Sequence, residues 1–275
     1  MSDNTITITR PSIANPIPAA QKIDIPKYPT EVISLPSQGI PYSDTSPLSS
    51  GELELKQMTA KEENLLVSQN LLKKNIVLDK LLESLVIDKD IKLDDMLMCD
   101  TDAAIFAIRR LAYGDTYDTT IGCSKCGKEN EVAIDLSLMK NKEIDFSIFQ
   151  KGENSIPFTL PNSKINITFK LLTRKDIYNI DKEIEGLKKI NKESSTEITT
   201  RLIHIITSVD GSSETSKIRK FVNENLLSKD SLELRKYIKK ISPALDTTFE
   251  FCCEHCDFKR KEETPMGVTF FWPNQ

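Results

Sequence analysis

The chain has 275 residues, of which 39% are hydrophobic and 28% charged, and its formal net charge is -4 at pH 7. This length can bury a sizeable core, and the small acidic excess argues against a dedicated nucleic-acid binder, which usually carries a basic excess. No run of about 18 apolar residues predicts a membrane span. The first residues lack the layout of a secretory signal, so we expect a protein kept in a reducing cytoplasm.

Residues 1–48 hold eight of the thirteen prolines. Proline removes a backbone donor and disfavours helix in the residue before it. We therefore expect an extended arm over 1–48, with a disordered tail as the alternative for residues 1–30. Residues 32–42 mix apolar anchors with turn residues, which favours a segment that lies against a protein surface.

Residues 49–142 are predicted to form a first folded unit. The alternating run ELELK predicts a short strand at 52–56. Thr59 precedes Glu62 by three residues, which is the spacing of a capping box and predicts the start of a helix.

Two further helices are expected in this unit, at about 76–86 and 102–112. Asp100 or Thr101 is the expected N-terminal cap of the later helix, and Gly114 is its expected C-terminal stop. The runs YDTTIGC and NEVAIDL then predict two strands on either side of a Cys-x-x-Cys pair.

A second unit, residues 155–266, is predicted to repeat this plan. INITFKLLTRKDIYNI aligns with GELELKQMTAKEENLL at an offset of 114. SKDSLELRKYIKKISPALDTT aligns with DTDAAIFAIRRLAYGDTYDTT at an offset of 128, which matches Asp230 to Asp102. We predict an α+β fold in which a strand–helices–strand–CxxC–strand unit is duplicated. Chance similarity among helices rich in Lys and Leu is the alternative.

Two cysteine pairs, Cys123 with Cys126 and Cys253 with Cys256, lie at an offset of 130. In a reducing compartment, paired cysteines indicate metal ligands or redox groups before disulfides. Four thiolates suit a structural Zn²⁺, and an iron centre equally. A duplication would explain the 126 residues between the pairs, because each unit would donate one knuckle to a zinc-ribbon-like site joining the units. Metal-free buried cysteines and thiol redox chemistry are the alternatives.

The remaining cysteines and histidines have plainer interpretations. We expect Cys99 and Cys252 in the core, His204 packed on a helix, and His255 facing solvent or replacing a cysteine as ligand. The sequence has no phosphate loop, nucleophile elbow or His-Glu-x-x-His motif. Since a four-thiolate zinc has no open position for substrate, we expect no enzyme.

The C-terminal residues 267–275 form an aromatic tail. Aromatic residues are enriched at the cores of protein interfaces, so the tail is a candidate partner-binding segment. A last strand packing on the protein's own core is the alternative. The proposed partner-binding residues are Phe270, Phe271, Trp272 and Pro273.

Four segments, in the order LPSQGIPY, KQMTAKEENLLVSQNLLKKNIVLDKLL, CSKCG and FFWP, resemble the bacteriophage base plate protein family of T-even-like phages. The resemblance covers most of residues 32–140 and the last ten residues, and weakens over 141–245. It implies a baseplate hub subunit of a contractile tail, which would bind other hub, tail tube or tape-measure proteins. It also implies a location in the tail baseplate of the virion, after assembly in the host cytoplasm.

Two alternative functions stay open. One is a tail assembly chaperone that leaves the virion. The other is a zinc-ribbon adaptor for nucleic acid, for which Lys259, Arg260 and Lys261 beside Phe258 offer only a small basic patch followed by acids. Membrane partners are not expected, and the sequence leaves open whether the two repeats pair within one chain or between chains.

Overall fold

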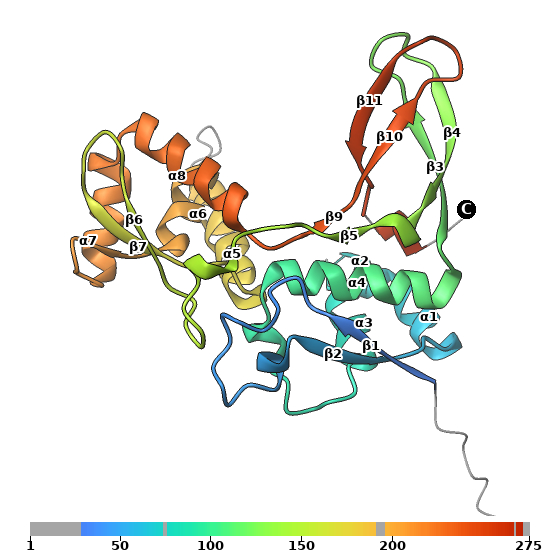
Figure 1. Cartoon of the computed structure of the whole chain (residues 1–275), viewed down its shortest axis with the longest axis horizontal. Coiled ribbons are helices and arrows are strands. Elements are labelled where there is room, and N and C mark those ends of the chain that lie inside the picture. The colour runs from blue at the N-terminus through green and yellow to red at the C-terminus, as the bar shows by residue number, and fades with distance from the viewer. Residues whose placement is uncertain (1–28, 74–75, 191–195, 267, 272–275) are drawn as a thin grey trace, which may run out of the picture.

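The structure is a computed structural model that describes residues 29–73, 76–190, 196–266 and 268–271. Helices and small antiparallel sheets make an α+β fold (Figure 1). Within the described part of the chain, no helix is long and apolar enough to cross a membrane.

Three parts can be distinguished in Figure 1: a first body, a second body, and a pair of hairpins that projects from them. The first body contains β1 (Thr30–Ser34), β2 (Glu52–Lys56), α1 (Ala60–Leu66), α2 (Gln69–Lys73), α3 (Val77–Leu85) and α4 (Met98–Tyr113). The second body contains β6 (Ile156–Thr159), β7 (Asn166–Phe169), α5 (Arg174–Ile190), α6 (Glu197–Ile205), β8 (Ile206–Val209), α7 (Thr215–Lys220) and α8 (Ser228–Ile241).

The projecting part consists of two antiparallel hairpins, β3 (Thr116–Gly122) with β4 (Glu129–Asp135), and β10 (Thr248–Cys252) with β11 (Lys259–Glu263). Each hairpin is reached from one body. The connecting segments pair with each other as β5 (Lys140–Asn141) and β9 (Leu245–Asp246). The hairpins that carry the cysteines are therefore brought together by segments far apart in the sequence.

The start of the first body differs from the expected arm. β1 pairs with β2, and Leu35 and Tyr42 are 1% and 7% exposed, so residues 30–48 pack on the first body. The boundary expected at residue 48 does not correspond to a break in the structure, because β1, before that boundary, pairs with β2 after it. Residues 1–28 lie outside the described residues.

The expected elements of the first body are largely confirmed. β2 coincides with the strand predicted at 52–56, and α1 begins after Thr59 with a capping box to Glu62. Gly114 ends α4, with a φ of 83° and its N–H donated to Arg110 O at 2.8 Å. The strands predicted on both sides of the first cysteine pair are β3 and β4.

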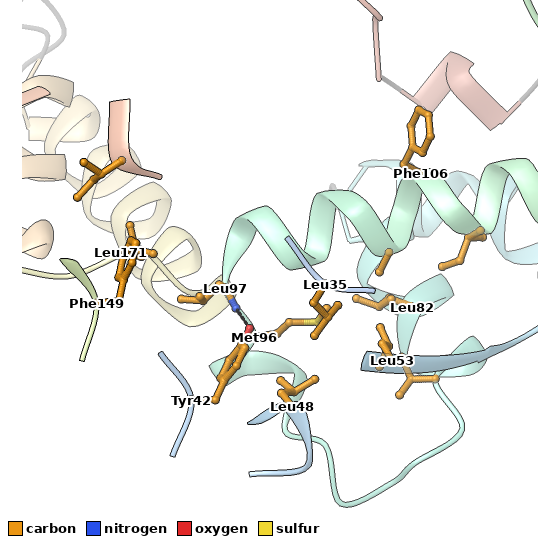
Figure 2. Packing of buried hydrophobic residues seen from close by; sticks show 14 of the residues in the cluster. Leu35, Tyr42, Leu48, Leu53, Leu82, Met96, Leu97, Phe106, Phe149 and Leu171 are labelled. Atoms are coloured by element: carbon orange, nitrogen blue, oxygen red, sulfur yellow. Dashed lines mark hydrogen bonds between the residues drawn. The ribbon is translucent and has the colours of Figure 1, made fainter. Parts of the chain in front are cut away.

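The expected cap at Asp100 or Thr101 is wrong, because α4 begins at Met98 and Leu97 is its N-cap. Asp100 is fully buried and accepts hydrogen bonds from another segment instead. Ser37 N–H and Ser37 Oγ donate to its two carboxylate oxygens at 3.0 and 2.7 Å, and Tyr42 OH donates at 2.6 Å. Tyr42 OH also accepts the N–H of Leu97 at 2.9 Å, so this loop supplies the cap of the helix (Figure 2).

The second body contains the same arrangement around Asp230. This residue is the third of α8, as Asp100 is the third of α4, and both are 0% exposed. Asp230 accepts the backbone N–H of Asn162 at 2.8 Å and of Ser163 at 3.0 Å. In its contacts Asp230 thus resembles Asp100 rather than Asp102, the residue that the sequence alignment matched to it. Asp100 and Asp230 are 130 residues apart, as are the two cysteine pairs.

The loops that reach these two aspartates also agree. LPSQG, residues 35–39, and LPNSK, residues 160–164, both follow the first strand of a hairpin. Gly39 and Lys164 occupy the same place, with φ of 74° and 60°. A side chain at Gly39 would meet Ser49 O at 2.5 Å, so this position requires glycine in the first loop.

Further contacts recur at matching positions. Lys56 pairs with Glu62 at 3.0 Å, and Lys170 pairs with Asp176 at 2.7 Å, each within the cap of the helix after the hairpin. α3 and α6 have nine residues each, and their C-terminal N–H groups are donated to Leu82 O and Leu202 O. By these contacts α3 in the first body resembles α6 in the second, 120 residues later in the sequence.

One cluster of buried apolar side chains runs through both bodies. Figure 2 shows part of it, with Leu35, Leu48 and Leu53 below α4 and Phe106 above it. Met96, Leu97 and Leu171 lie where the two bodies meet, and the N–H of Met98 is donated to Leu172 O at 3.0 Å. The bodies therefore share a core.

Candidate metal centre

The four predicted cysteines meet at the tips of the two hairpins. Cys123 and Cys126 lie in the turn from β3 to β4, and Cys253 and Cys256 lie in the turn from β10 to β11. The four Sγ atoms all lie within 4.8 Å of one another. The structure thus brings together two pairs that are separated by 126 residues in the sequence.

The sulfur separations match a tetrahedral metal site. Cys123 Sγ lies 3.8 Å from Cys256 Sγ, and Cys126 Sγ lies 3.7 Å from Cys253 Sγ. A zinc ion with sulfur ligands at about 2.3 Å requires an edge of about 3.8 Å between ligands. Disulfide sulfurs would lie about 2 Å apart, and all four cysteines are free.

Backbone hydrogen bonds close both turns in the same way. The N–H of Cys123 is donated to Lys128 O at 2.9 Å, and the N–H of Cys253 to Phe258 O at 3.0 Å. Gly127 has a φ of 71°, as a tight knuckle commonly requires. Asp257 occupies the matching place, and it is absent from the positive-φ residues of the described chain. The second turn therefore closes without the left-handed residue of the first.

The thiols affect one another's ionisation. Burial opposes ionisation of Cys123, but the N–H groups of Cys126 and Lys125 outweigh it and lower its pKa to about 6. The N–H of Phe258 favours ionisation of Cys256, yet burial and the neighbouring thiols outweigh it and raise its pKa to about 12. Four thiolates in this space repel one another, so full ionisation requires a bound cation.

Apolar side chains form the base of the cluster. Ile121, Cys123 and Phe251 are buried together, and Phe249, Val132 and Phe258 pack against them. Ile121 and Phe251 are two residues before the first cysteine of their turns, so the alternation of each strand points them inward. The exposed side of the site is formed by Cys126.

Asn130 is a site residue that the sequence reasoning missed. Its side chain is 2% exposed and donates to Lys128 O at 3.1 Å, within its own turn. Its Oδ1 accepts the N–H of Glu254 at 2.8 Å, in the opposite turn. Asn130 thereby fixes one knuckle against the other. Its place four residues after Cys126 in a polar run gave no sign of burial.

The spare residues lie outside the cluster. The Nε2 of His255 lies 3.2 Å from the carbonyl oxygen of Glu129, which can only accept a hydrogen bond, and His255 is not among the four clustered residues. Cys252 is exposed, so its expected core position is wrong, because the opposite face of β10 meets solvent. Cys99 is partly buried and packs against the core cluster. His204 lies 3.0 Å from Glu183, in a group that also holds Arg219.

The aromatic tail packs on the protein's own core. Phe270 and Phe271 are 0% and 1% exposed and belong to a 3-10 helix, Val268–Phe271, rather than a strand. The ring of Phe270 stacks on Phe106 at 6.0 Å and meets Tyr117 edge-on at 4.9 Å. Their burial favours the own-core alternative over direct partner contact. Trp272 and Pro273 lie outside the described residues.

Arg109 of α4 holds this tail, and it was not singled out from the sequence. Its side chain is fully buried and donates Nε to Phe270 O at 2.7 Å, with further bonds to Gly114 O and Thr116 O. Its guanidinium also lies over the rings of Tyr113, Tyr117 and Phe270. These interactions thus join α4, β3 and the C-terminal segment.

Comparison with known proteins gives one family. No curated protein and no solved structure matches the chain. Residues 40–272 match the family described as T4 bacteriophage base plate protein. The match covers the second body, both cysteine-bearing hairpins, all four clustered cysteines and the first body except β1 and the start of the loop after it. The chain therefore belongs to the T4 bacteriophage base plate protein family.

Proposed function

We propose that this baseplate family member is a structural subunit of the baseplate hub that acts by binding other tail proteins. The observation that carries the proposal is the family match over residues 40–272, which covers most of the described chain rather than one motif. Other hub subunits, the tail tube and the tape-measure protein are the proposed partners. The proposed location is the tail baseplate of the virion, reached after assembly in the host cytoplasm.

The proposed cofactor is one structural Zn²⁺ held by Cys123, Cys126, Cys253 and Cys256. The support is the donor set and the sulfur separations of 3.7 and 3.8 Å, which suit a closed tetrahedral site. Bound there, the ion would join the two hairpins and fill every ligand position. A non-catalytic role agrees with such a closed site. Four thiolates also accept iron, which elemental analysis distinguishes.

The chain is also proposed to be a tandem duplication. Support comes from the recurring contacts: a buried aspartate in the first turn of α4 and α8, a Lys–carboxylate pair in each capping box, and one Cys-x-x-Cys turn per hairpin. Chance similarity would not place Asp100, Asp230 and the cysteines at the single offset of 130. In this proposal each copy contributes two of the four thiolates within one chain.

The nucleic-acid alternative has less support. Arg260 forms an ion pair with Glu262 at 2.7 Å, and β11 has Glu263 at its end. Its basic side chains therefore lie among acids rather than forming the continuous basic face that phosphate binding needs.

Genetic complementation tests the proposal and separates it from the chaperone alternative. A phage lacking this chain should assemble no complete hub, as seen by electron microscopy of purified baseplates. Mass spectrometry of complemented, purified virions should detect the chain at a fixed stoichiometry. Detection only in assembly intermediates would favour the chaperone, and normal baseplates without the chain would overturn the proposal.

A further inference from the structure

The second body carries an apolar groove between α6 and α8. A hollow of about 300 Å³ lies there, lined by Ile205 and Ile238 among others. A second hollow, of about 280 Å³, adjoins it at the same two residues and extends to Met98 and Asp102 of α4. Leu202 is 2% exposed and forms part of the floor, whereas Ile198 at the start of α6 is 52% exposed. A large apolar side chain at the wall of a hollow is the usual character of a binding surface.

Within the described residues, the first body has no open groove at the matching position, because its own side chains fill the space. α3 matches α6 at an offset of 120, and α4 matches α8 at an offset of 130. Leu85 and Ile108 thus stand where the second body has Ile205 and Ile238, and they are 0% and 2% exposed. Ile205 and Ile238 are only partly buried. The groove is therefore not imposed by the fold, since the first body fills it with its own side chains.

The α8 side of the groove is basic. Arg235 and Lys239 of α8 are exposed and line the first hollow. Among the residues that the structure describes, no carboxylate forms an ion pair with either. Arg201, on the opposite side, pairs with Glu197 at 3.3 Å. A bound segment with carboxylates near Arg235 and Lys239 would form ion pairs with both side chains.

Lys239 also matches Arg109 at the offset of 130. In the first body, that position donates to the main chain of the C-terminal segment at Phe270 O. The first body thus already uses this helix position to hold a segment with large apolar side chains. The corresponding position of the second body has no such segment against it within the described residues.

We propose that the groove between α6 and α8 binds an acidic, amphipathic segment of another baseplate protein. The apolar stripe of that segment would lie on Ile198, Ile205 and Ile238, and its carboxylates would meet Arg235 and Lys239. The inference rests on the proposed function, because it names a surface through which this subunit would bind a partner.

Fluorescence anisotropy with two designed peptides tests the proposal on the full-length chain. The first peptide carries leucines at i, i+3, i+4 and i+7 with glutamates elsewhere, and the second replaces every glutamate by lysine. We expect the acidic peptide to bind and the basic one not to bind. Substituting Arg235→Glu together with Lys239→Glu should weaken binding by about tenfold or more, because close charge pairs at an interface carry that much coupling.

A matched control keeps the net charge change the same. Lys220→Glu with Lys229→Glu reverses two exposed charges outside the groove and should leave binding unchanged. Ile198→Glu should abolish binding through the apolar wall, with circular dichroism confirming the fold.

Three results would overturn the inference. They are equal binding of both peptides, unchanged binding by the Arg235/Lys239 variant, and self-association in sedimentation velocity that Ile198→Glu removes. The last would make a second copy the occupant. The peptide assay uses the isolated chain, so a negative result there does not affect the interpretation of the virion experiment. Likewise, a negative virion experiment does not affect the interpretation of peptide binding.

Discussion

The two bodies share their plan and differ in how they are closed. Each has a hairpin, a capped helix, and a helix whose third residue is a buried aspartate. The first body is completed by the C-terminal segment, which Arg109 holds over α4. The second body has Lys239 at the same position, exposed at the rim of an open groove. The contacts found in both bodies therefore maintain the fold. Positions at which the two bodies carry different residues, such as Arg109 and Lys239, determine which surface stays exposed.

The largest expected difference between the two bodies is the stability lost when Arg109 or its counterpart Lys239 is replaced. Arg109→Ala removes a buried donor from three carbonyl groups and leaves a cavity, so we expect a loss of roughly 3–5 kcal/mol in the free energy of unfolding. Lys239→Ala at the matching exposed position should change it by about 0.5 kcal/mol or less. Urea unfolding of both variants measures the difference. An equal loss of unfolding free energy in both variants would contradict the inference that Arg109 holds the C-terminal segment on the first body.

The two buried aspartates should respond to pH in opposite directions. Burial of Asp230 opposes ionisation, but the amide groups of Asn162 and Ser163 outweigh it and lower its pKa to about 2. Its carboxylate therefore stabilises the fold above the unfolded pKa, and this contribution is lost as the pH falls toward 2. Burial raises the pKa of Asp100 despite its bonds to Tyr42 and Ser37. Its protonation accordingly favours the fold as the pH falls.

Asparagine variants measure this contrast by urea unfolding between pH 7 and pH 2. The stability difference between wild type and Asp230→Asn should shrink as the pH falls below 4. The difference between wild type and Asp100→Asn should grow as the pH falls. Parallel pH profiles for the two variants would show that the aspartates are not held by different environments.

Removing Asn130 should have the smallest effect on folding and a specific effect on metal. Asn130→Ala breaks the bond that joins the two cysteine turns. Groups outside the ligand set that orient a metal site commonly contribute 10–100-fold to affinity. We expect at least about a tenfold loss of zinc affinity in competition with a chromophoric chelator. Lys125→Ala, exposed in the first turn, is the control and should leave the affinity unchanged.

The local elements could be predicted because their signals are local. The capping box at Thr59, the stop at Gly114 and the alternating runs that flank the cysteines depend on neighbours within a few residues. The four clustered cysteines could be predicted because cysteine spacing indicates a knuckle without knowledge of the rest of the chain.

The remaining features depend on contacts over long distances in sequence. Nothing near Asp100 shows that Ser37 and Tyr42 will meet it, so its carboxylate was mistaken for a helix cap. Arg109 looks like a surface residue in AIRRLAY, because its acceptors lie in other segments. One sequence signal of the similar loops is the LP motif, which recurs in LPSQG and LPNSK at an offset of 125.

Elemental analysis of the purified full-length chain, beside Cys253→Ser, is the most direct test of a metal ion held by all four cysteines. We expect about one zinc per wild-type chain, lost in the variant together with thermal stability, because one ion would join both hairpins. Metal-free wild-type protein, purified without chelators, would contradict a metal centre shared by the two halves.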